Sequence, residues 1–276
     1  METNLKLKND LVFKAFFSKK GNEKYLKSFL ESLLKIEIDE IEIIGEATLL
    51  QMTKDAKLGR IDIKATINKR EIVNIEIQLK DKNNMEKRSI FYGAKLITDN
   101  FGKKEEYKDI KPVILINILN YNLLKVPEYC TKTVTVAEKH REYEVIKDVT
   151  YYFIELPKFR KSKPKLANKL ECWLALIDDE DRGLIEMAKK KEQIIEEANK
   201  EVEEILSEAV IKEINDYRQT AIWEENSMIG YAKEKGLKEG RKEEKIDIAK
   251  KLLEMKMTIE DIIKATGLTK EEIEKL

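Results

Sequence analysis

The sequence predicts an α/β domain followed by a carboxy-terminal part that is almost entirely helical. At 276 residues the chain exceeds the usual size of a single domain, so it can hold one sizeable domain and a smaller appendage. Apolar residues alternate with polar ones from Ile36 to Leu79, which is typical of strands, and helical patterns stand on both sides of this region. From about Leu166 onward the pattern is helical almost throughout.

Two amphipathic helices are expected before the strands. Asn9 can cap the first helix, because an asparagine side chain accepts hydrogen bonds from the N–H groups at a helix start. Apolar residues recur at helical spacing in both segments. They are Leu11, Val12, Ala15 and Phe16 in the first helix and Tyr25, Phe29, Leu30, Leu33 and Leu34 in the second.

After the alternating region, one more helix and three more strands are expected. The helix runs from about Met85 to Asn100. PVILINIL, which starts at Pro112, is a continuous apolar run of the kind found in strands covered on both faces. CTKTVTVA, from Cys130, and VTYYFIEL, from Val149, are the other two strands, and the Lys/Glu-rich segment EKHREYEV between them is expected to be a turn.

Composition narrows the class of protein. Charged residues make up 38% of the chain and hydrophobic residues 42%, which fits a soluble globular protein with long solvated helices. The longest apolar runs are too short to span a membrane, and the start METNLKLKND lacks the apolar stretch of a signal peptide. We therefore expect no membrane partner and a cytoplasmic location. The 53 basic and 53 acidic residues balance, which argues against tight non-specific binding of polyanions but allows a local basic patch.

Cysteine and histidine offer little chemistry in this sequence. Cys130 and Cys172 are isolated from each other and from His140, which is the only histidine, so neither a disulfide framework nor a zinc site has support. Each cysteine is expected to be a buried or half-buried apolar residue. Triads built on histidine are poor candidates too. Any catalysis must therefore rest on carboxylates.

The chain is expected to divide into residues 1–180, 181–240 and 241–276. The middle segment is a long, coiled-coil-like helical region that ends in a charged connector with repeated glycines. It carries an apolar stripe that suits either a helix packed on its own domain or a dimerising helix. The stripe consists of Ile195, Ala198, Val202, Ile205 and Ala209. Through these carboxy-terminal helices the chain is expected to form a homo-oligomer.

The last segment has the outline of a helix-turn-helix. Thr258 can cap one helix, Thr269 and Glu272 form a capping box for the next, and Gly267 lies in the turn. From Thr258 to the end, five acids outnumber three bases, and carboxylates lie where DNA phosphates would approach a recognition helix. We interpret the segment as a small protein-interaction or dimerisation module.

The hairpin GRIDIKATINKREIVNIEIQLK, residues 59–80, carries a polar row that can form a site. Its odd-numbered residues are apolar, so both apolar rows reach one core only if the numbers of paired residues add to an even value. A three-residue turn from Asn68 to Arg70 satisfies this requirement and places Asp62 opposite Glu76. Gln78 projects from the same face.

Two carboxylates that face each other destabilise a sheet unless a cation lies between them. Mg²⁺ or Mn²⁺ suits such oxygen ligands, and the ion can deprotonate a water and stabilise charge on a scissile phosphate. Gln78 could orient that water without acting as a base. The alternative is an exposed hairpin face whose acids are neutralised by Lys64 and Lys80, and alternation alone favours this alternative.

Asp62, followed by Glu76-Ile-Gln78 on the next strand, resembles the D…(D/E)-x-K motif of the PD-(D/E)XK nucleases. The form with glutamine in place of lysine is that of the recombination-promoting nuclease and transposase family. NDLVFKAFF, RSIFY, PVILINIL and YFIELPKF match in the same order, so the resemblance covers roughly residues 5 to 180. It implies a restriction-endonuclease-like core, in which a central mixed sheet is flanked by helices, and Mg²⁺-dependent hydrolysis of DNA phosphodiesters.

The resemblance also implies roles for single residues. Asp62 and Glu76 would hold the metal, together with the backbone carbonyl of Ile77, and Gln78 would occupy the lysine position. Asp10 falls in the family's amino-terminal D-x-x-F-like pattern. It has either a supporting role in the site or the plain role of an acid at a helix start, which the helix dipole stabilises.

Several basic residues are candidates for contacts with DNA. Lys80 could supply the charge that Gln78 lacks, or it protects a strand end. Arg88 and Tyr92 are spaced i and i+4 on a helix and could face the cleft, although Tyr92 could equally pack in the core. A basic cluster could follow a DNA backbone or form a solvated linker at the domain edge. Its members proposed to contact DNA are Lys158, Arg160, Lys161 and Lys163.

Two functions from different classes follow. The first is a metal-dependent DNA endonuclease with a helical oligomerisation tail, which acts in recombination or on mobile DNA. The second is a catalytically silent protein that keeps the nuclease fold and binds DNA or other proteins through its tail. The uncharged Gln78 and the zero net charge motivate the second.

Overall fold

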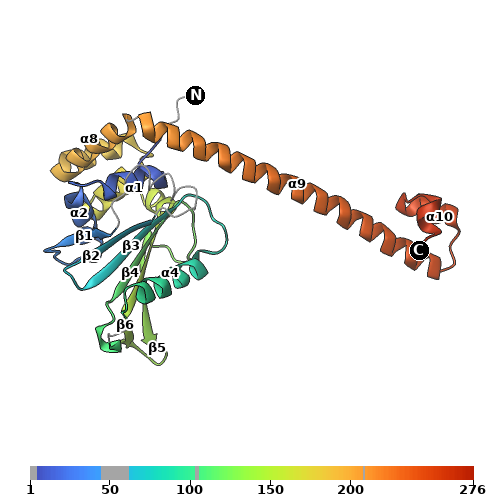
Figure 1. The fold of residues 1–276 in the computed structure, drawn as a ribbon, viewed down its shortest axis with the longest axis horizontal. Coiled ribbons are helices and arrows are strands. Elements are labelled where there is room, and N and C mark those ends of the chain that lie inside the picture. Colours follow the sequence, from blue (N-terminus) through green and yellow to red (C-terminus); the bar gives the residue numbers. More distant parts are fainter. Residues whose placement is uncertain (1–4, 45–61, 103–105, 208) are drawn as a thin grey trace. The chain divides into compact units, whose positions relative to one another are not determined.

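The computed structural model describes residues 5–44, 62–102, 106–207 and 209–276 (Figure 1). The chain forms two compact units, Met1–Asn215 and Asp216–Leu276. The part of the expected strand region at residues 45–61, including the first three residues of the hairpin, lies outside the described residues.

The first unit is built on a mixed six-stranded sheet with the strand order β1-β2-β3-β4-β6-β5. The strands β1, β2 and β3 are antiparallel, β3, β4 and β6 are parallel, and β5 is antiparallel to β6. The sheet is the mixed sheet that the sequence predicts. The strands are β1 Ile41–Ile44, β2 Asp62–Ile67, β3 Glu71–Gln78, β4 Val113–Leu119, β5 Cys130–Ala137 and β6 His140–Glu155.

The pairing of β2 with β3 confirms the predicted register. Ile67 pairs with Glu71, and Asp62 pairs with Glu76. The three-residue turn contains Asn68 and Lys69 at φ values of 50° and 58°, a region that asparagine tolerates better than most residues. The Asn68 side chain accepts hydrogen bonds from the N–H groups of residues 39 and 40, so the turn is also tied to the segment that leads into β1.

The three helices expected in the first 100 residues are present in this unit. Asn9 caps α1 by accepting hydrogen bonds from Leu11 and Val12, as predicted. The helix expected from Met85 to Asn100 is α4. The helical elements are α1 Asp10–Ser18, α2 Glu23–Leu34, α4 Met85–Asp99, the short 3-10 helix η1 Tyr107–Asp109, α5 Leu156–Lys161, α6 Lys169–Asp178, α7 Arg182–Lys191 and α8 Gln193–Ser207.

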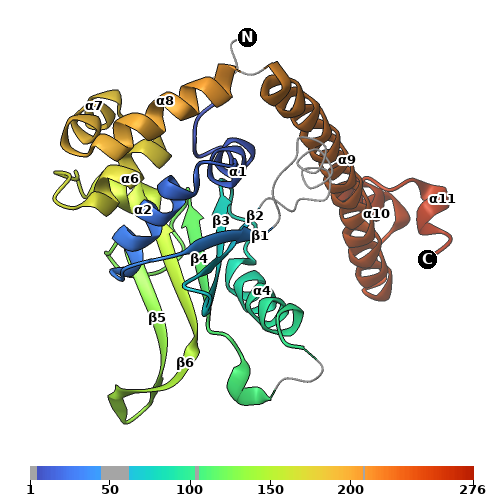
Figure 2. The same ribbon diagram turned by 60° about the vertical axis from the view of Figure 1, so that its left-hand side comes forward.

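Helices cover both faces of the sheet, as in a restriction-endonuclease-like α/β fold. Figure 2 shows α1, α2 and α6 on one side and α4 on the other. The odd-numbered apolar residues of β2 and β3 join the larger core, where Trp173 of α6 packs with Phe17 and Phe29. On the opposite face, Leu96 of α4 packs with Ile72 of β3 and with Val113 and Leu115 of β4.

The apolar stripe of α8 packs on its own domain. Ile195, Ala198, Val202 and Ile205 are buried in the larger core, and α8 contacts α1, α2 and α6. The first compact unit continues to Asn215 and includes α8, and the division of the chain into three functional segments stays a prediction. The side chain of Ala209 lies outside the described residues.

The turn between β5 and β6 is shorter than expected. EKHREYEV was expected to be a turn, but β6 already begins at His140, and its outer half forms a solvated hairpin with β5. Alternation is weak in this segment because both faces of the hairpin are mostly exposed there. Cys130 is half-buried and Cys172 is buried, as predicted.

The second unit holds the end of α9 Ala209–Glu254, α10 Ile259–Thr266 and α11 Lys270–Ile273 around a small core that contains Ala249 and Ile262. The predicted caps are confirmed. Thr258 accepts a hydrogen bond at the start of α10, and Thr269 forms a capping box with Glu272. Within the described parts of the chain, we find no helix that is both long enough and apolar enough to cross a membrane.

Gly93 controls how closely α4 approaches the sheet. A Cβ atom added at Gly93 would lie 3.1 Å from Tyr151 Oη and 3.4 Å from Leu115 Cδ1. We expect Gly93→Val to destabilise the fold by about 1–3 kcal/mol, the usual cost of overpacking. Ala94→Val, on the exposed side of the same helix, is the control and should cost only about 0.5 kcal/mol through helix propensity. Urea unfolding measures both, and equal stability of the two variants would contradict this packing.

Candidate functional site

The candidate site lies on the face of the sheet that α4 covers. Glu76 projects from the middle of the sheet, and its side chain is only 6% exposed, while Gln78 at the end of β3 is half-buried. The alternative of an exposed hairpin face is therefore wrong for Glu76. The alternation along β3 therefore separates two faces that are both buried. It does not separate a buried face from a solvent-exposed one.

Glu76 is held by two donors. Gln78 Nε2 donates a hydrogen bond to Glu76 Oε1 at 3.0 Å, and Arg88 Nη2 forms an ion pair with the same oxygen. The guanidinium of Arg88 lies over the ring of Tyr92, 5.1 Å from its centroid. Two of the predicted residues, Gln78 and Arg88, are thus brought to Glu76, and Tyr92, the i+4 partner of Arg88 on α4, packs against the guanidinium. A buried carboxylate is tolerable only with such a partner.

Asp62 lies beside Glu76 on the neighbouring strand. Ile72 donates its N–H to Pro112 and Gln78 accepts from Asn120, so the even-numbered residues of β3 direct their backbone groups toward β4. Asp62 and Glu76 therefore form the non-hydrogen-bonded type of antiparallel pair, in which Cα atoms are about 4.5 Å apart and side chains lie closest. Ile77, with the opposite parity, directs its carbonyl toward β2.

Asn117 is a buried polar neighbour of Glu76 that the sequence patterns did not predict. Asn117 of β4 is paired with Glu76 in register and is fully covered by α4. It accepts a hydrogen bond from Ser89 Oγ at 3.4 Å and donates one to the carbonyl of Tyr152 at 3.3 Å. The available signal was that Asn117 alone interrupts the apolar run PVILINIL. Its bonds join α4, β4 and β6 behind the site.

Tyr121, which follows β4, is a second residue that sequence reasoning missed. Burial, together with the negative charges of Asp81, Glu76 and Glu86, raises the pKa of Tyr121 to about 12. Its hydroxyl therefore stays protonated at neutral pH and can donate a hydrogen bond near the site. Nothing in the local sequence distinguishes this tyrosine from the others.

The residues present fit a hard divalent cation. Asp62 and Glu76 are paired in register at the junction of β2 and β3, and two carboxylates with the carbonyl of Ile77 would form the oxygen donor set that Mg²⁺ and Mn²⁺ prefer. Glu76 is buried and already has a cation beside it in Arg88. Among the described side chains no group of three or more His, Cys, Asp or Glu residues gathers.

Two of the supporting residues lie at the ends of secondary-structure elements. Asp10 Oδ1 accepts a hydrogen bond from the N–H of Leu11 at 3.0 Å, as an acid at a helix start does. Lys80 lies just past the end of β3 and is exposed. Their supporting roles stay predictions.

The basic segment after β6 belongs to the packed domain and is not a solvated linker. Lys158 Nζ donates to Glu155 Oε2 at 2.6 Å and to the carbonyl of Leu124 at 2.7 Å, and the Glu155 side chain is completely buried. Arg160 forms an ion pair with Asp178 at 2.5 Å. Lys158 and Arg160 thus have internal partners, whereas Lys161 and Lys163 are exposed.

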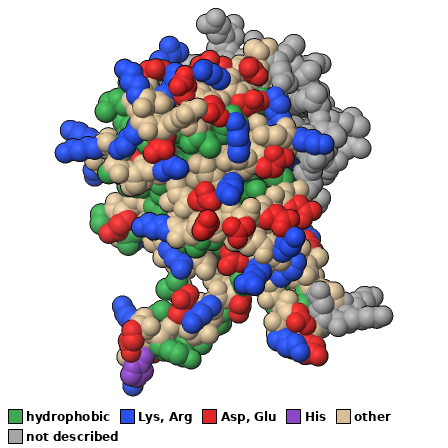
Figure 3. All heavy atoms as spheres, turned by 90° about the vertical axis from the view of Figure 1, so that its left-hand side faces the viewer, with side chains coloured by type: hydrophobic (Ala, Val, Ile, Leu, Met, Phe, Trp, Pro, Cys, Tyr) green, Lys and Arg blue, Asp and Glu red, His purple; other side chains and the backbone are tan. Residues whose placement is uncertain are grey.

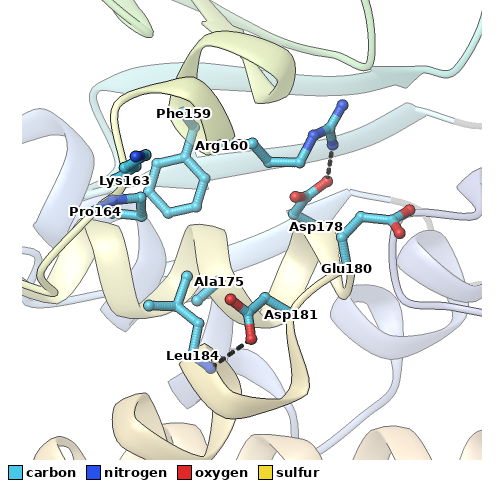
Figure 4. Close-up of a pocket in the computed structure, with 9 residues that line it drawn as sticks. All are labelled: Phe159, Arg160, Lys163, Pro164, Ala175, Asp178, Glu180, Asp181 and Leu184. Atoms are coloured by element: carbon cyan, nitrogen blue, oxygen red, sulfur yellow. Dashed lines mark hydrogen bonds and ion pairs between the residues drawn. The ribbon is translucent and has the colours of Figure 1, made fainter.

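A pocket of about 350 Å³ lies beside Arg160. Figure 4 shows Arg160 directed toward Asp178, with Lys163 and Pro164 at the opposite side of the pocket. Its lining also includes Glu180 and Asp181, so acids outnumber bases there. On the face drawn in Figure 3, Lys and Arg side chains are interspersed with Asp and Glu, in keeping with the zero net charge. Contacts of Lys161 and Lys163 with DNA stay predictions.

Comparison with known families decides the assignment. The family model of the PD-(D/E)XK nuclease family transposases matches residues 7–232, which is well over half of the chain. The chain belongs to this family of PD-(D/E)XK nuclease transposases. The resemblance inferred from the hairpin is thereby confirmed, and so is the restriction-endonuclease-like fold class.

A second family model matches the end of this PD-(D/E)XK nuclease family member. Residues 242–276 match the carboxy-terminal HTH domain of the Rpn/YhgA-like nuclease family. The helix-turn-helix outline seen in the sequence is therefore correct, and whether this domain contacts protein or DNA stays a prediction. No curated protein and no solved structure matches the chain significantly.

The internal pairing of Lys158 can be tested by stability. Lys158→Met would leave the Glu155 carboxylate buried without its cation, a loss that typically costs about 3–5 kcal/mol. Lys161→Met, three residues along the same helix but exposed, should change stability by less than about 0.5 kcal/mol. Thermal unfolding at neutral pH compares the two. Similar melting temperatures would show that Lys158 has no structural role.

Proposed function

We propose that this protein is a metal-dependent DNA endonuclease that hydrolyses phosphodiester bonds, acting in recombination or on mobile DNA. The single observation that supports this most is the buried Glu76, which lies opposite Asp62 and is held by Gln78 and Arg88. A residue whose only role is to pack within the sheet would be expected to have an apolar side chain at this buried position. Membership of a nuclease family adds the reaction class.

In this proposal, Asp62, Glu76 and the carbonyl of Ile77 hold Mg²⁺ or Mn²⁺. When bound, the ion activates a water and stabilises charge on the scissile phosphate. Gln78 positions the water: its amide NH₂ group donates to Glu76, which leaves the amide oxygen to accept a hydrogen bond from the water. Asp10 and Lys80 have supporting roles near this centre.

DNA is the proposed partner. The HTH family of residues 242–276 supports a contact with DNA, and the exposed Lys161 and Lys163 can contact phosphates. The excess of acids after Thr258 favours a protein contact for the same segment, because carboxylates repel phosphate. We therefore assign DNA to the nuclease domain first, and an interaction role to the HTH module.

Glu76→Gln should abolish metal binding and nuclease activity, because it removes a charged oxygen ligand. We expect purified wild type to bind Mn²⁺ in calorimetric titration and to nick plasmid with Mg²⁺ or Mn²⁺. Asp62→Ala should behave like Glu76→Gln. Glu71→Gln is the matched control, since it makes the same change five residues earlier on β3, away from the pair with Asp62, and should keep both properties.

The same measurements separate the proposal from its alternative. If wild type and both site variants nick DNA equally, the site is not the nuclease centre. If wild type binds no Mn²⁺ and cuts no DNA, the catalytically silent protein that works through its helical tail is the better description.

We also propose that α9 joins two copies of the chain. Trp223 and Tyr231 of this helix are 68% and 72% exposed, and Met228 and Ile229 are exposed between them. Large apolar side chains on one helix favour burial against another helix. The double variant Trp223→Glu/Tyr231→Glu should shift a dimer to monomer in light scattering, whereas Lys235→Glu, also exposed on α9, should not. A wild-type monomer at micromolar concentration would rule this out.

A further inference from the structure

The charge that Gln78 lacks is present in the site, but it comes from a different element. A lysine at position 78 would bring its ammonium to the strand end beside Glu76. Instead, the guanidinium of Arg88 reaches Glu76 from α4, while Gln78 donates to the same oxygen. Of the other candidate bases, Lys158 is engaged by Glu155, Arg160 is engaged by Asp178 and Lys80 is exposed.

We infer that Arg88 takes the place of the motif's lysine and that it changes partner during the cycle, from Glu76 in the metal-free protein to the scissile phosphate once the divalent ion occupies Glu76. This inference rests on the proposed function. Arg88 would then stabilise the charge of Glu76 when no metal is bound, and it would bind the phosphate of the substrate when the metal is present.

Charge balance supports the exchange. In the metal-free protein, Asp62 and Glu76 carry two negative charges against the one positive charge of Arg88, so these three side chains have a net charge of −1. A divalent ion held by the two carboxylates would change this net charge to +1. A phosphodiester brings one negative charge, which restores neutrality in a site of low dielectric. Metal and DNA would therefore bind in a coupled manner, through Arg88.

Geometry supports it as well. Glu76 Oε1 receives both Gln78 and Arg88, so a metal that uses this oxygen must displace a donor. Tyr92 lies beneath the guanidinium, and this cation–π contact can hold Arg88 in the site after it leaves Glu76. The side chain of Arg88 is 25% exposed, so it can reach a ligand at the surface. A guanidinium presents a planar fork that matches phosphate oxygens.

Arg88→Met separates the two roles, because it should affect metal and substrate in opposite directions. Without a competing cation, Mn²⁺ should bind about 5-fold more tightly or better in calorimetric titration, an effect within the usual size of one coupling between sites. Nicking at saturating Mn²⁺ should fall by about 100-fold, as after loss of one preorganised donor to developing charge. Lys87→Met, an exposed neighbour on α4, is the control and should change neither.

Arg88→Lys is a second variant that keeps the positive charge, in case Arg88→Met does not fold. It should bind Mn²⁺ within about 2-fold of wild type, because the competing charge is kept, and nick about 10-fold more slowly, because the bidentate fork is lost. Unchanged nicking by this variant would overturn the inference.

The outcomes distinguish this inference from the proposed function. A wild type that neither binds Mn²⁺ nor nicks DNA removes the proposed function and this inference together. A wild type that does both, with an Arg88→Met variant that binds Mn²⁺ more weakly or nicks at the wild-type rate, overturns only the role of Arg88.

Discussion

Glu76 lies beneath α4, and a carboxylate in that position needs a cation beside it. The cost of desolvating a charge in a protein interior is several kcal/mol even after relaxation, so an unpaired glutamate would destabilise the sheet or take up a proton. Arg88 meets this requirement from the helix that causes the burial. The ion pair between Arg88 and Glu76 therefore links the placement of α4 to the stability of the sheet and to the charge of the site.

The strand β3 makes the arrangement possible because it has different neighbours on its two sides. Its antiparallel partner β2 supplies Asp62 across from Glu76, and its parallel partner β4 supplies the buried Asn117. A parallel connection between β3 and β4 requires a crossover, and α4 is that crossover. The carboxylates, their cation and the polar contact behind them thus come from consecutive elements of the chain, β2, β3, α4 and β4.

Although acids and bases are equal in number, individual charged side chains have specific partners inside the protein. Lys158 is paired with the buried Glu155 at the end of β6, and Arg160 is paired with the buried Asp178 at the end of α6. A count of basic residues in a short segment therefore overstates what can reach a DNA backbone. Because 38% of the residues are charged, a basic side chain can already be paired with an acid, and it is then not available to contact DNA.

Much of the site was predictable because its geometry follows from local rules. Parity alone requires an odd-length turn and sets Asp62 opposite Glu76, and the pair is found in that register. Caps such as Asn9 and Thr269 define helix starts through hydrogen bonds that span only a few residues. The polar Asn117 was visible in the sequence, but no local rule says which long-range neighbour it meets.

The sequence by itself determined the register of β2 with β3, the helix starts capped by Asn9, Thr258 and Thr269, and the identity of the facing carboxylates, because these depend on side-chain period and short-range hydrogen bonds. Only the tertiary structure decided that the polar row is covered, that Arg88 and not Lys80 meets Glu76, and that the stripe of α8 closes its own domain. Alternation shows that two faces of a strand differ, but burial depends on which distant helix packs there.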